Sequence, residues 1–131
     1  SKLEIGSYKL LGKQPFKKLP EFVVASDVFV IPQRNNVATK GQLPAKIFDA
    51  MSLEIPVITS PVGDIRHILK ENGYYFEAGN IDDLRERIDY VLENYDETKV
   101  KARESRKDCI ENYSWSALEE KLSDVFSNYD I

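Results

Sequence analysis

The sequence predicts an α/β domain with a mostly parallel β-sheet, and two stretches support this fold class. The run Val28–Ile31 is continuously apolar and ends at Pro32, which is typical of a strand buried on both faces. The stretch Gly41–Ser60 (GQLPAKIFDAMSLEIPVITS) reads as a loop, an amphipathic helix, a tight turn and a second short apolar strand. Because one helix joins the two strands, we expect Val28–Ile31 and Val57–Thr59 to be parallel neighbours.

Upstream of this unit the pattern predicts a short strand and a helix. Apolar residues up to Leu11 favour a strand that ends near Gly12. The segment Pro15–Ser26 has a broad apolar face, as an amphipathic helix does. Since Pro20 fits only the first turn of a helix, the helix proper is expected to begin at Leu19.

The helix of the central stretch follows Pro44, whose missing N–H costs nothing in a first turn. Lys46 and Asp49 stand three residues apart and therefore share one face of this helix. Helix N-termini in α/β domains point free N–H groups toward the ligand cleft. The apolar residues of the helix are Ile47, Phe48, Ala50 and Met51.

Downstream, the pattern predicts a loop, a helix and a third strand. Ser60–Gly63 has turn chemistry, and Asp64 is expected to cap a helix over Ile65–Glu71. Asn72-Gly73 ends that helix, and Tyr74–Phe76 follows as a short strand.

Three helices are expected in the remainder of the chain. The first is amphipathic and begins at Asp82-Asp83, and the second covers Asp96–Asn112. Ser114 is expected to cap the last helix, Trp115–Asn128, which carries aromatic and aliphatic residues on one face.

Length and composition place residues 1–131 in a single small domain. The net charge of −4 disfavours binding to nucleic acid. No apolar run has the length of a transmembrane segment, no signal peptide is recognisable, and the single cysteine, Cys109, excludes an internal disulfide. We therefore expect a cytoplasmic protein. The only histidine, His67, is expected on the surface.

The polar segment Gln33–Gln42 is expected to be a long loop at the carboxyl end of the first strand, where α/β proteins bind ligands. Arg34, Lys40 and Lys46 add positive charge to this part of an acidic chain. These side chains fit an anion site, because arginine and lysine suit phosphate oxygens, and they equally fit a solvated loop. Both interpretations stay open at this point.

The segment PAKIFDAMSLEIPVITS resembles the nucleotide-sugar-binding segment of GT-B glycosyltransferases, in particular the retaining group 1, or family 4, enzymes. That family shows the pattern P-x-K-[LI]-[FL]-E-[AY]-M-A-x-G-x-P-V-[IV]. Asp49 stands where the family has a glutamate, and Glu54-Ile55 where a glycine and a variable residue are usual. The runs GYYFEAGNIDDL and Tyr113–Trp115 also fit, so the resemblance extends from about Leu11 to Trp115. The matching positions are Pro44, Lys46, Ile47, Phe48, Ala50, Met51, Pro56, Val57 and Ile58.

The resemblance implies a Rossmann-like three-layer sandwich that forms part of a C-terminal donor-binding domain. The first two βα units of that domain, and the N-terminal acceptor-binding domain, have no counterpart in this sequence. The implied reaction moves a sugar from a nucleotide-diphosphate sugar to a glycan or lipid acceptor held by the absent domain, without a cofactor or metal. The parent enzyme would act in the cytoplasm or peripherally at the inner face of the membrane, and the chain alone is expected to be inactive.

The resemblance also implies a donor site, without a catalytic residue in this chain. Asp49 would bond the ribose hydroxyls from a fixed position on its helix. Gly41 stands where relatives carry another glutamate, so backbone N–H groups are the expected donors to the sugar. Lys46 is either an aid to the nucleotide or an ordinary helix-face lysine. The expected nucleotide-sugar-binding residues are Arg34, Gly41, Gln42, Leu43, Lys46 and Asp49.

Two other classes of protein stay open. One is a non-catalytic interaction module. The other is a flavodoxin-like regulatory domain, but a receiver domain of that kind would show an acidic cluster after its first strand and a lysine after its last, and neither is visible. No segment matches the family strand that flanks Val28–Ile31, so we expect an exposed strand edge and a homodimer, unless Tyr8–Leu11 pairs there.

Overall fold

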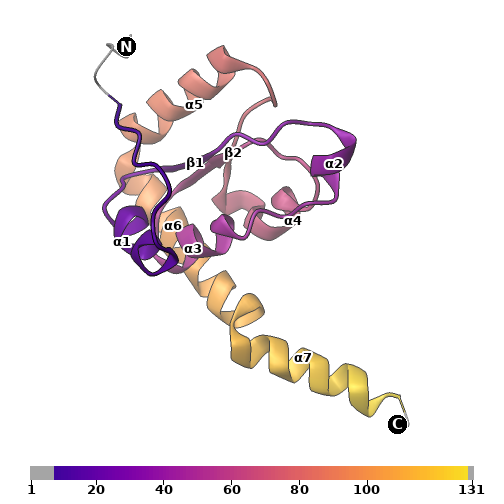
Figure 1. Ribbon diagram of the computed structural model, residues 1–131. Helices are drawn as coiled ribbons and strands as arrows, with labels where there is room; N and C mark the ends of the chain where they lie inside the picture. The colour runs from indigo at the N-terminus through magenta and orange to yellow at the C-terminus, as the bar shows by residue number, and fades with distance from the viewer. Residues whose placement is uncertain (1–7, 130–131) are drawn as a thin grey trace.

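The computed structural model describes residues 8–129, and its centre is a three-stranded parallel sheet (Figure 1). The strands are β1 (Phe29–Ile31), β2 (Val57–Thr59) and β3 (Tyr74–Tyr75), in the spatial order β1-β2-β3. Phe29 pairs with Val57, and Ile58 pairs with Tyr74. The expected parallel pairing of Val28–Ile31 with Val57–Thr59 is therefore confirmed.

Helices cover both faces of the sheet, which gives the three layers of an α/β sandwich (Figure 1). On one face, α5 (Ile81–Glu93) packs Val91 against Ile58, Tyr74 and Phe76. On the other face lie α1 (Leu19–Val24), α3 (Lys46–Ser52), α4 (Ile65–Leu69) and α6 (Tyr95–Tyr113). Successive strand residues point to opposite faces. Ile58 therefore joins a first core, on the face covered by α5, and Val57 joins a second core, on the face covered by α1, α3, α4 and α6. That second core contains Val23, Ile47, Ala50, Met51, Ile55, Val57, Ile65, Ile68, Leu69 and Cys109.

The remaining elements are short helices and one long one. The 3₁₀ turn η1 (Phe16–Lys18) leads into α1, which begins at Leu19 as the position of Pro20 predicts. A second 3₁₀ turn, η2 (Lys70–Asn72), follows α4. The helix α2 (Val37–Lys40) lies inside the segment expected to be a loop, and α7 (Trp115–Ser127) ends the described chain.

The strand expected to end near Gly12 is wrong for the part that the structure describes. Residues 8–12 are in no strand, and the start of the expected strand lies outside the described residues. Leu10 is 88% exposed, so its apolar character is not used in a core. Tyr8–Leu11 therefore does not pair with β1, whose outer edge has no strand partner within residues 8–129. The expected homodimer stays a prediction.

Of the two expected helix caps, the one at Ser114 is right and the one at Asp64 is wrong, and the expected start of α5 is nearly right. The Ala117 backbone N–H donates to Ser114 Oγ at 3.2 Å, which confirms the cap of α7. The cap of α5 is Asn80, whose Oδ1 accepts from Asp83 N at 3.0 Å, so this helix begins just before Asp82. Asp64 makes no side-chain cap bond to α4, because its backbone (φ −85°, ψ 4°) lacks the extended conformation of a capping residue.

The turn between α3 and β2 holds a non-glycine residue in a left-handed conformation. Glu54 has φ 58°, in the position where the related family usually has glycine. Helix α6 braces this turn from outside: Lys99 Nζ donates to the Glu54 carbonyl oxygen at 2.8 Å, and Arg106 lies 3.4 Å from its carboxylate. The strained turn is thus fixed by a helix that is distant in sequence.

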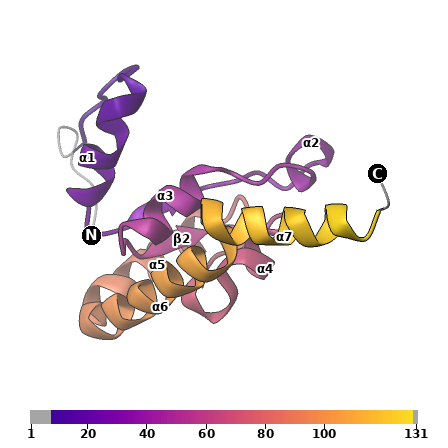
Figure 2. The ribbon, with the colours of Figure 1, turned by 90° about the horizontal axis from the view of Figure 1, so that it is seen from below.

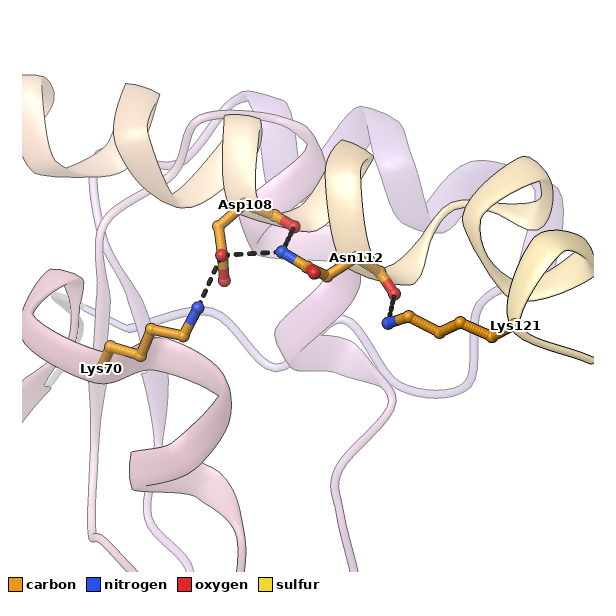
Figure 3. Close-up of polar contacts among 4 residues, drawn as sticks. All are labelled: Lys70, Asp108, Asn112 and Lys121. Carbon is orange, nitrogen blue, oxygen red and sulfur yellow. Dashed lines mark hydrogen bonds and ion pairs between the residues drawn. The ribbon is translucent and has the colours of Figure 1, made fainter. Parts of the chain in front are cut away.

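Figure 3 shows how α6 connects η2 with α7. Lys70 Nζ lies 2.7 Å from Asp108 Oδ1, and Asn112 Nδ2 donates to the same oxygen at 3.0 Å. Lys121 Nζ of α7 donates to the Asn112 carbonyl oxygen at 3.0 Å. The hydrogen bond to Asp108 raises the pKa of Lys70 above its usual value.

Beyond this junction α7 runs away from the body of the sandwich (Figures 1 and 2). No residue of α7 is buried, and Trp115 is 89% exposed. Among residues 8–129, no helix has the length and apolar character needed to cross a membrane.

Candidate functional site

The segment from Gln33 to Leu43 lies at the carboxyl ends of β1 and β2, the edge where open α/β sheets bind ligands. Side chains from β2 and the residue after it fix the start of the segment. Thr59 Oγ1 donates to the Ile31 carbonyl oxygen at 3.0 Å, and Ser60 Oγ donates to the Gln33 carbonyl oxygen at 2.6 Å. Both hydroxyl-bearing residues are fully buried, so β1 continues into the segment along a defined path.

The helix α2 organises the middle of the segment. Asn36 Oδ1 accepts from Thr39 N at 3.0 Å, and Thr39 Oγ1 accepts from Asn36 N at 3.1 Å, which is a reciprocal capping box. The Thr39 hydroxyl also donates to the carbonyl oxygen of Arg34. The expected loop is therefore wrong in this part: the N-x-x-T spacing of Asn36 and Thr39 is the local signal that could have shown a helix start.

One side chain closes the two ends of the segment onto each other. Gln33 Nε2 lies 3.3 Å from the Thr39 carbonyl oxygen and 3.4 Å from the Gln42 carbonyl oxygen. The second bond brings Gln33, which precedes Arg34, to Gln42, nine positions further along the sequence. Of the predicted site residues, Arg34, Gly41, Gln42 and Leu43 therefore belong to one closed loop and not to an extended chain.

Gly63, in the loop after β2, packs directly against this segment. Its φ is +60°, and a Cβ built there would lie 2.6 Å from the Lys40 carbonyl oxygen. A contact of that length excludes any side chain unless the backbone shifts. The close approach of Gly63 thus sets the position of the end of α2 relative to β2.

The predicted site residues occupy this loop and the first turn of α3. Lys46 is the first residue of α3 and is exposed, and Asp49 lies in the same turn and is half-buried. Arg34, Gly41, Gln42 and Leu43 are exposed. Within residues 8–129 the Asp49 carboxylate accepts no hydrogen bond and forms no ion pair, so its oxygens remain available.

Two residues with reactive side chains, His67 and Cys109, lie elsewhere. His67 is exposed on α4, as expected. Cys109 is buried in the larger core, and burial raises the pKa of its thiol, which disfavours the reactive thiolate form. In the part of the chain that the structure describes, no three His, Cys, Asp or Glu side chains gather as metal ligands would.

The parallel sheet and the two helical layers define a Rossmann-like α/β domain. The family model described as "Glycosyl transferases group 1" matches residues 2–115. The chain therefore belongs to the group 1 glycosyltransferases, as the pattern around Pro44–Ile58 suggested.

Three individual proteins are similar to this chain. The chain is 26% identical over 110 residues to an uncharacterized glycosyltransferase of Methanocaldococcus jannaschii, a match that covers 82% of this chain and 27% of the relative. The sucrose-phosphate synthase of Thermosynechococcus elongatus has a similar structure, with a TM-score of 0.77 and 18% identity over 90% of this chain and 29% of that one. HepE of Anabaena, solved in complex with UDP, has a TM-score of 0.69 and 16% identity over 85% of this chain and 30% of that one.

The two solved structures confirm the Rossmann-like fold class. The chain spans less than a third of the length of each of these three proteins.

Proposed function

We propose that this chain is the donor-binding part of a retaining glycosyltransferase that uses a nucleotide-diphosphate sugar. The observation that carries the proposal is the closed loop from Gln33 to Leu43, joined to the first turn of α3 at the carboxyl edge of the sheet. Arg34 and Lys46 supply positive charge there, and Asp49 supplies a carboxylate with no partner among the described residues.

Each group has a role in this proposal. Asp49 accepts hydrogen bonds from ribose hydroxyls, and its place in a helix turn fixes its direction. The exposed backbone around Gly41–Leu43 offers N–H groups to the sugar or the diphosphate. Arg34 and Lys46 offset the charge that develops on the diphosphate as it leaves, so the chain needs no nucleophile of its own.

The acceptor, a glycan or lipid, would bind to a domain outside this chain. The three similar proteins are each more than three times as long as the segment that they share with it, which leaves room for such a domain. A GT-B enzyme assembles its reaction centre between two domains. We therefore expect the chain alone to bind the donor and not to transfer the sugar.

Nucleotide titration of this chain tests the proposal. The structure of HepE was solved with UDP, so UDP is the first probe, with GDP and ADP for comparison. We expect one of the three diphosphates to raise the melting temperature, because a ligand that binds only the folded state stabilises it. The Asp49→Ala variant should lose that shift, and Asp96→Ala should keep it, since Asp96 is an exposed acid in the first turn of α6, away from the loop.

Three results would each contradict a part of the proposal. If no nucleoside diphosphate binds at millimolar concentration, the non-catalytic interaction module becomes the better interpretation. If Asp49→Ala binds as tightly as the unchanged chain, the ribose role of Asp49 is wrong. Sugar transfer to an added acceptor by this chain alone would overturn the expectation that it is inactive.

A further inference from the structure

A cavity of about 350 Å³ lies at β3, the edge strand on the side of the sheet away from β1. Its walls come from α4, β3, α5 and α6, and it shares no residue with the proposed donor segment. The volume falls in the range of small-molecule sites. The side chains that matter for the argument are Arg66, Tyr74, Tyr75, Arg87, Tyr90 and Lys101.

Three cations from three different helices line this cavity, in a chain whose net charge is −4. The Arg66 guanidinium lies 4.3 Å from the centre of the Tyr75 ring, and Lys101 Nζ lies 5.1 Å from the centre of the Tyr74 ring. Within residues 8–129 neither cation forms an ion pair. The aromatic faces hold both cations in place without neutralising them.

The third cation has a donor with no partner. Arg87 approaches Asp83 only at 3.7 Å, through one terminal nitrogen. Its Nε is shielded from solvent and has no hydrogen-bond partner among the described residues. Among the described residues, Glu71 is the only carboxylate that lines the cavity, and Asp83 lies next to Arg87, so positive side chains still outnumber negative ones there. Such an excess of donors is what a bound anion would satisfy.

The Tyr75 hydroxyl adds no negative charge to the cavity at neutral pH. Burial, opposed in part by Arg66, raises the pKa of Tyr75 to about 12, and its hydroxyl donates to the Lys70 carbonyl oxygen at 2.6 Å. Gly73, just before the strand, is tightly packed, since a Cβ there would lie 2.9 Å from the Leu69 Cβ and 2.8 Å from the Tyr75 hydroxyl. The outer side of β3 has no strand partner in the described chain, so backbone groups border the cavity as well.

We propose that this cavity binds a small phosphate monoester, with the phosphate held by Arg66, Arg87 and Lys101. Arginine forks match phosphate oxygens in pairs, and the lysine adds a point charge. Tyr90, which is 43% exposed at the rim, offers a ring face to the carbon part of the ligand. Glu71 can accept hydrogen bonds from hydroxyl groups of that part.

The test is a ligand titration of the chain at constant ionic strength, in which the shifts of the amide NMR signals are measured. The probes are glucose 6-phosphate, inorganic phosphate and glucose. We expect saturable shifts at Gly73 and Tyr75 with the ester, weaker ones with inorganic phosphate, and none with glucose. Shifts confined to Gly41 and Gln42 would overturn the proposal, because they would place the phosphate in the donor segment.

Charge-removing variants make the test specific. Lys101→Met should weaken binding of the ester by roughly fivefold to tenfold, as for loss of one charge-assisted bond. Lys107→Met is the matched control, because Lys107 lies on the same helix, is exposed and does not line the cavity. Arg66→Gln, on α4, should act like Lys101→Met and covers the case in which that variant fails to fold. Equal affinity in all three variants and the unchanged chain would refute the site.

Discussion

Two regions of the molecule have an amphipathic or apolar sequence: the unit formed by α3 and β2, and the helix α7. The two regions differ completely in burial. In α3, Ile47 and Ala50 are 0% exposed, and every residue of β2 is buried. In α7 no residue is buried, although Leu122 and Phe126 repeat at helical spacing. An apolar stripe thus shows that a helix face needs a cover, but it does not identify the cover.

The family match helps to explain this contrast. It ends at residue 115, where α7 begins, so the shared pattern covers the α3–β2 unit but not the last helix. The unit is covered from within the chain: Phe48 of α3 packs on Tyr113 of α6, with ring centres 5.1 Å apart. Stability should therefore be concentrated in the unit and nearly absent from α7.

The largest expected difference comes from truncating one apolar side chain in each region. Ile58→Ala removes a fully buried side chain and should lower the free energy of unfolding by about 2–5 kcal/mol. Leu122→Ala removes a side chain that is 55% exposed and should change it by no more than about 0.5 kcal/mol. Urea denaturation measures both. A Leu122→Ala loss as large as that of Ile58→Ala would show that α7 is covered in solution, for instance by a second copy.

The next effect concerns the loop that joins the unit to the proposed donor site. Gly63→Ala places a Cβ 2.6 Å from the Lys40 carbonyl oxygen in addition to a left-handed backbone, whereas Gly79→Ala (φ +88°) has open space around it. We expect Gly79→Ala to cost about 1–2 kcal/mol and Gly63→Ala clearly more, because only the second must move a backbone.

Gly63→Ala should also weaken nucleoside diphosphate binding, because the clash displaces the end of α2 and with it Gly41 and Gln42. Gly79→Ala lies outside this loop and should leave binding unchanged. Equal stability losses in the two variants would show that the close contact at Gly63 is relaxed in solution.

Particular residues show how much of the fold and of the candidate site could be predicted from the sequence. The order of strands and helices followed from Val28–Ile31, Pro44 and Val57–Thr59, because short apolar runs and proline positions act locally. The strand expected before Gly12 failed because apolar residues alone do not make a strand: residues 8–12 do not pair with the open edge of β1, and Leu10 stays 88% exposed. For the candidate site, the types of residue could be predicted from the sequence. The Gln33 hydrogen bonds that close the loop could not, because they depend on the folded chain.

The contact between α6 and the Glu54 turn also depends on the folded chain and could not be predicted from the sequence. Forty-five residues separate Lys99 from Glu54, and no local pattern connects them. The sequence showed only that Glu54 replaces a usual glycine. The structure adds that the backbone there keeps the glycine-like φ of 58°.

The smallest expected effect tests whether the turn between α3 and β2 carries backbone strain at Glu54. The contacts with α6 would hold that strain in place. Glu54→Gly should remove the left-handed strain of about 1–2 kcal/mol, offset by about 0.5–1 kcal/mol for the greater backbone freedom of glycine in the unfolded chain. It also removes the exposed ion pair with Arg106, whose nitrogen lies 3.4 Å away and which is worth about 0–1 kcal/mol. Glu54→Ala loses the same ion pair but keeps the strain, and the Lys99 bond goes to the backbone, so it survives in both variants. The difference between the two variants therefore isolates the backbone: we expect Glu54→Gly to be more stable than Glu54→Ala by roughly 0.5–1 kcal/mol in urea denaturation. If the alanine variant is equally or more stable, the turn does not keep its left-handed conformation in solution, and the bracing by α6 has no strain to hold.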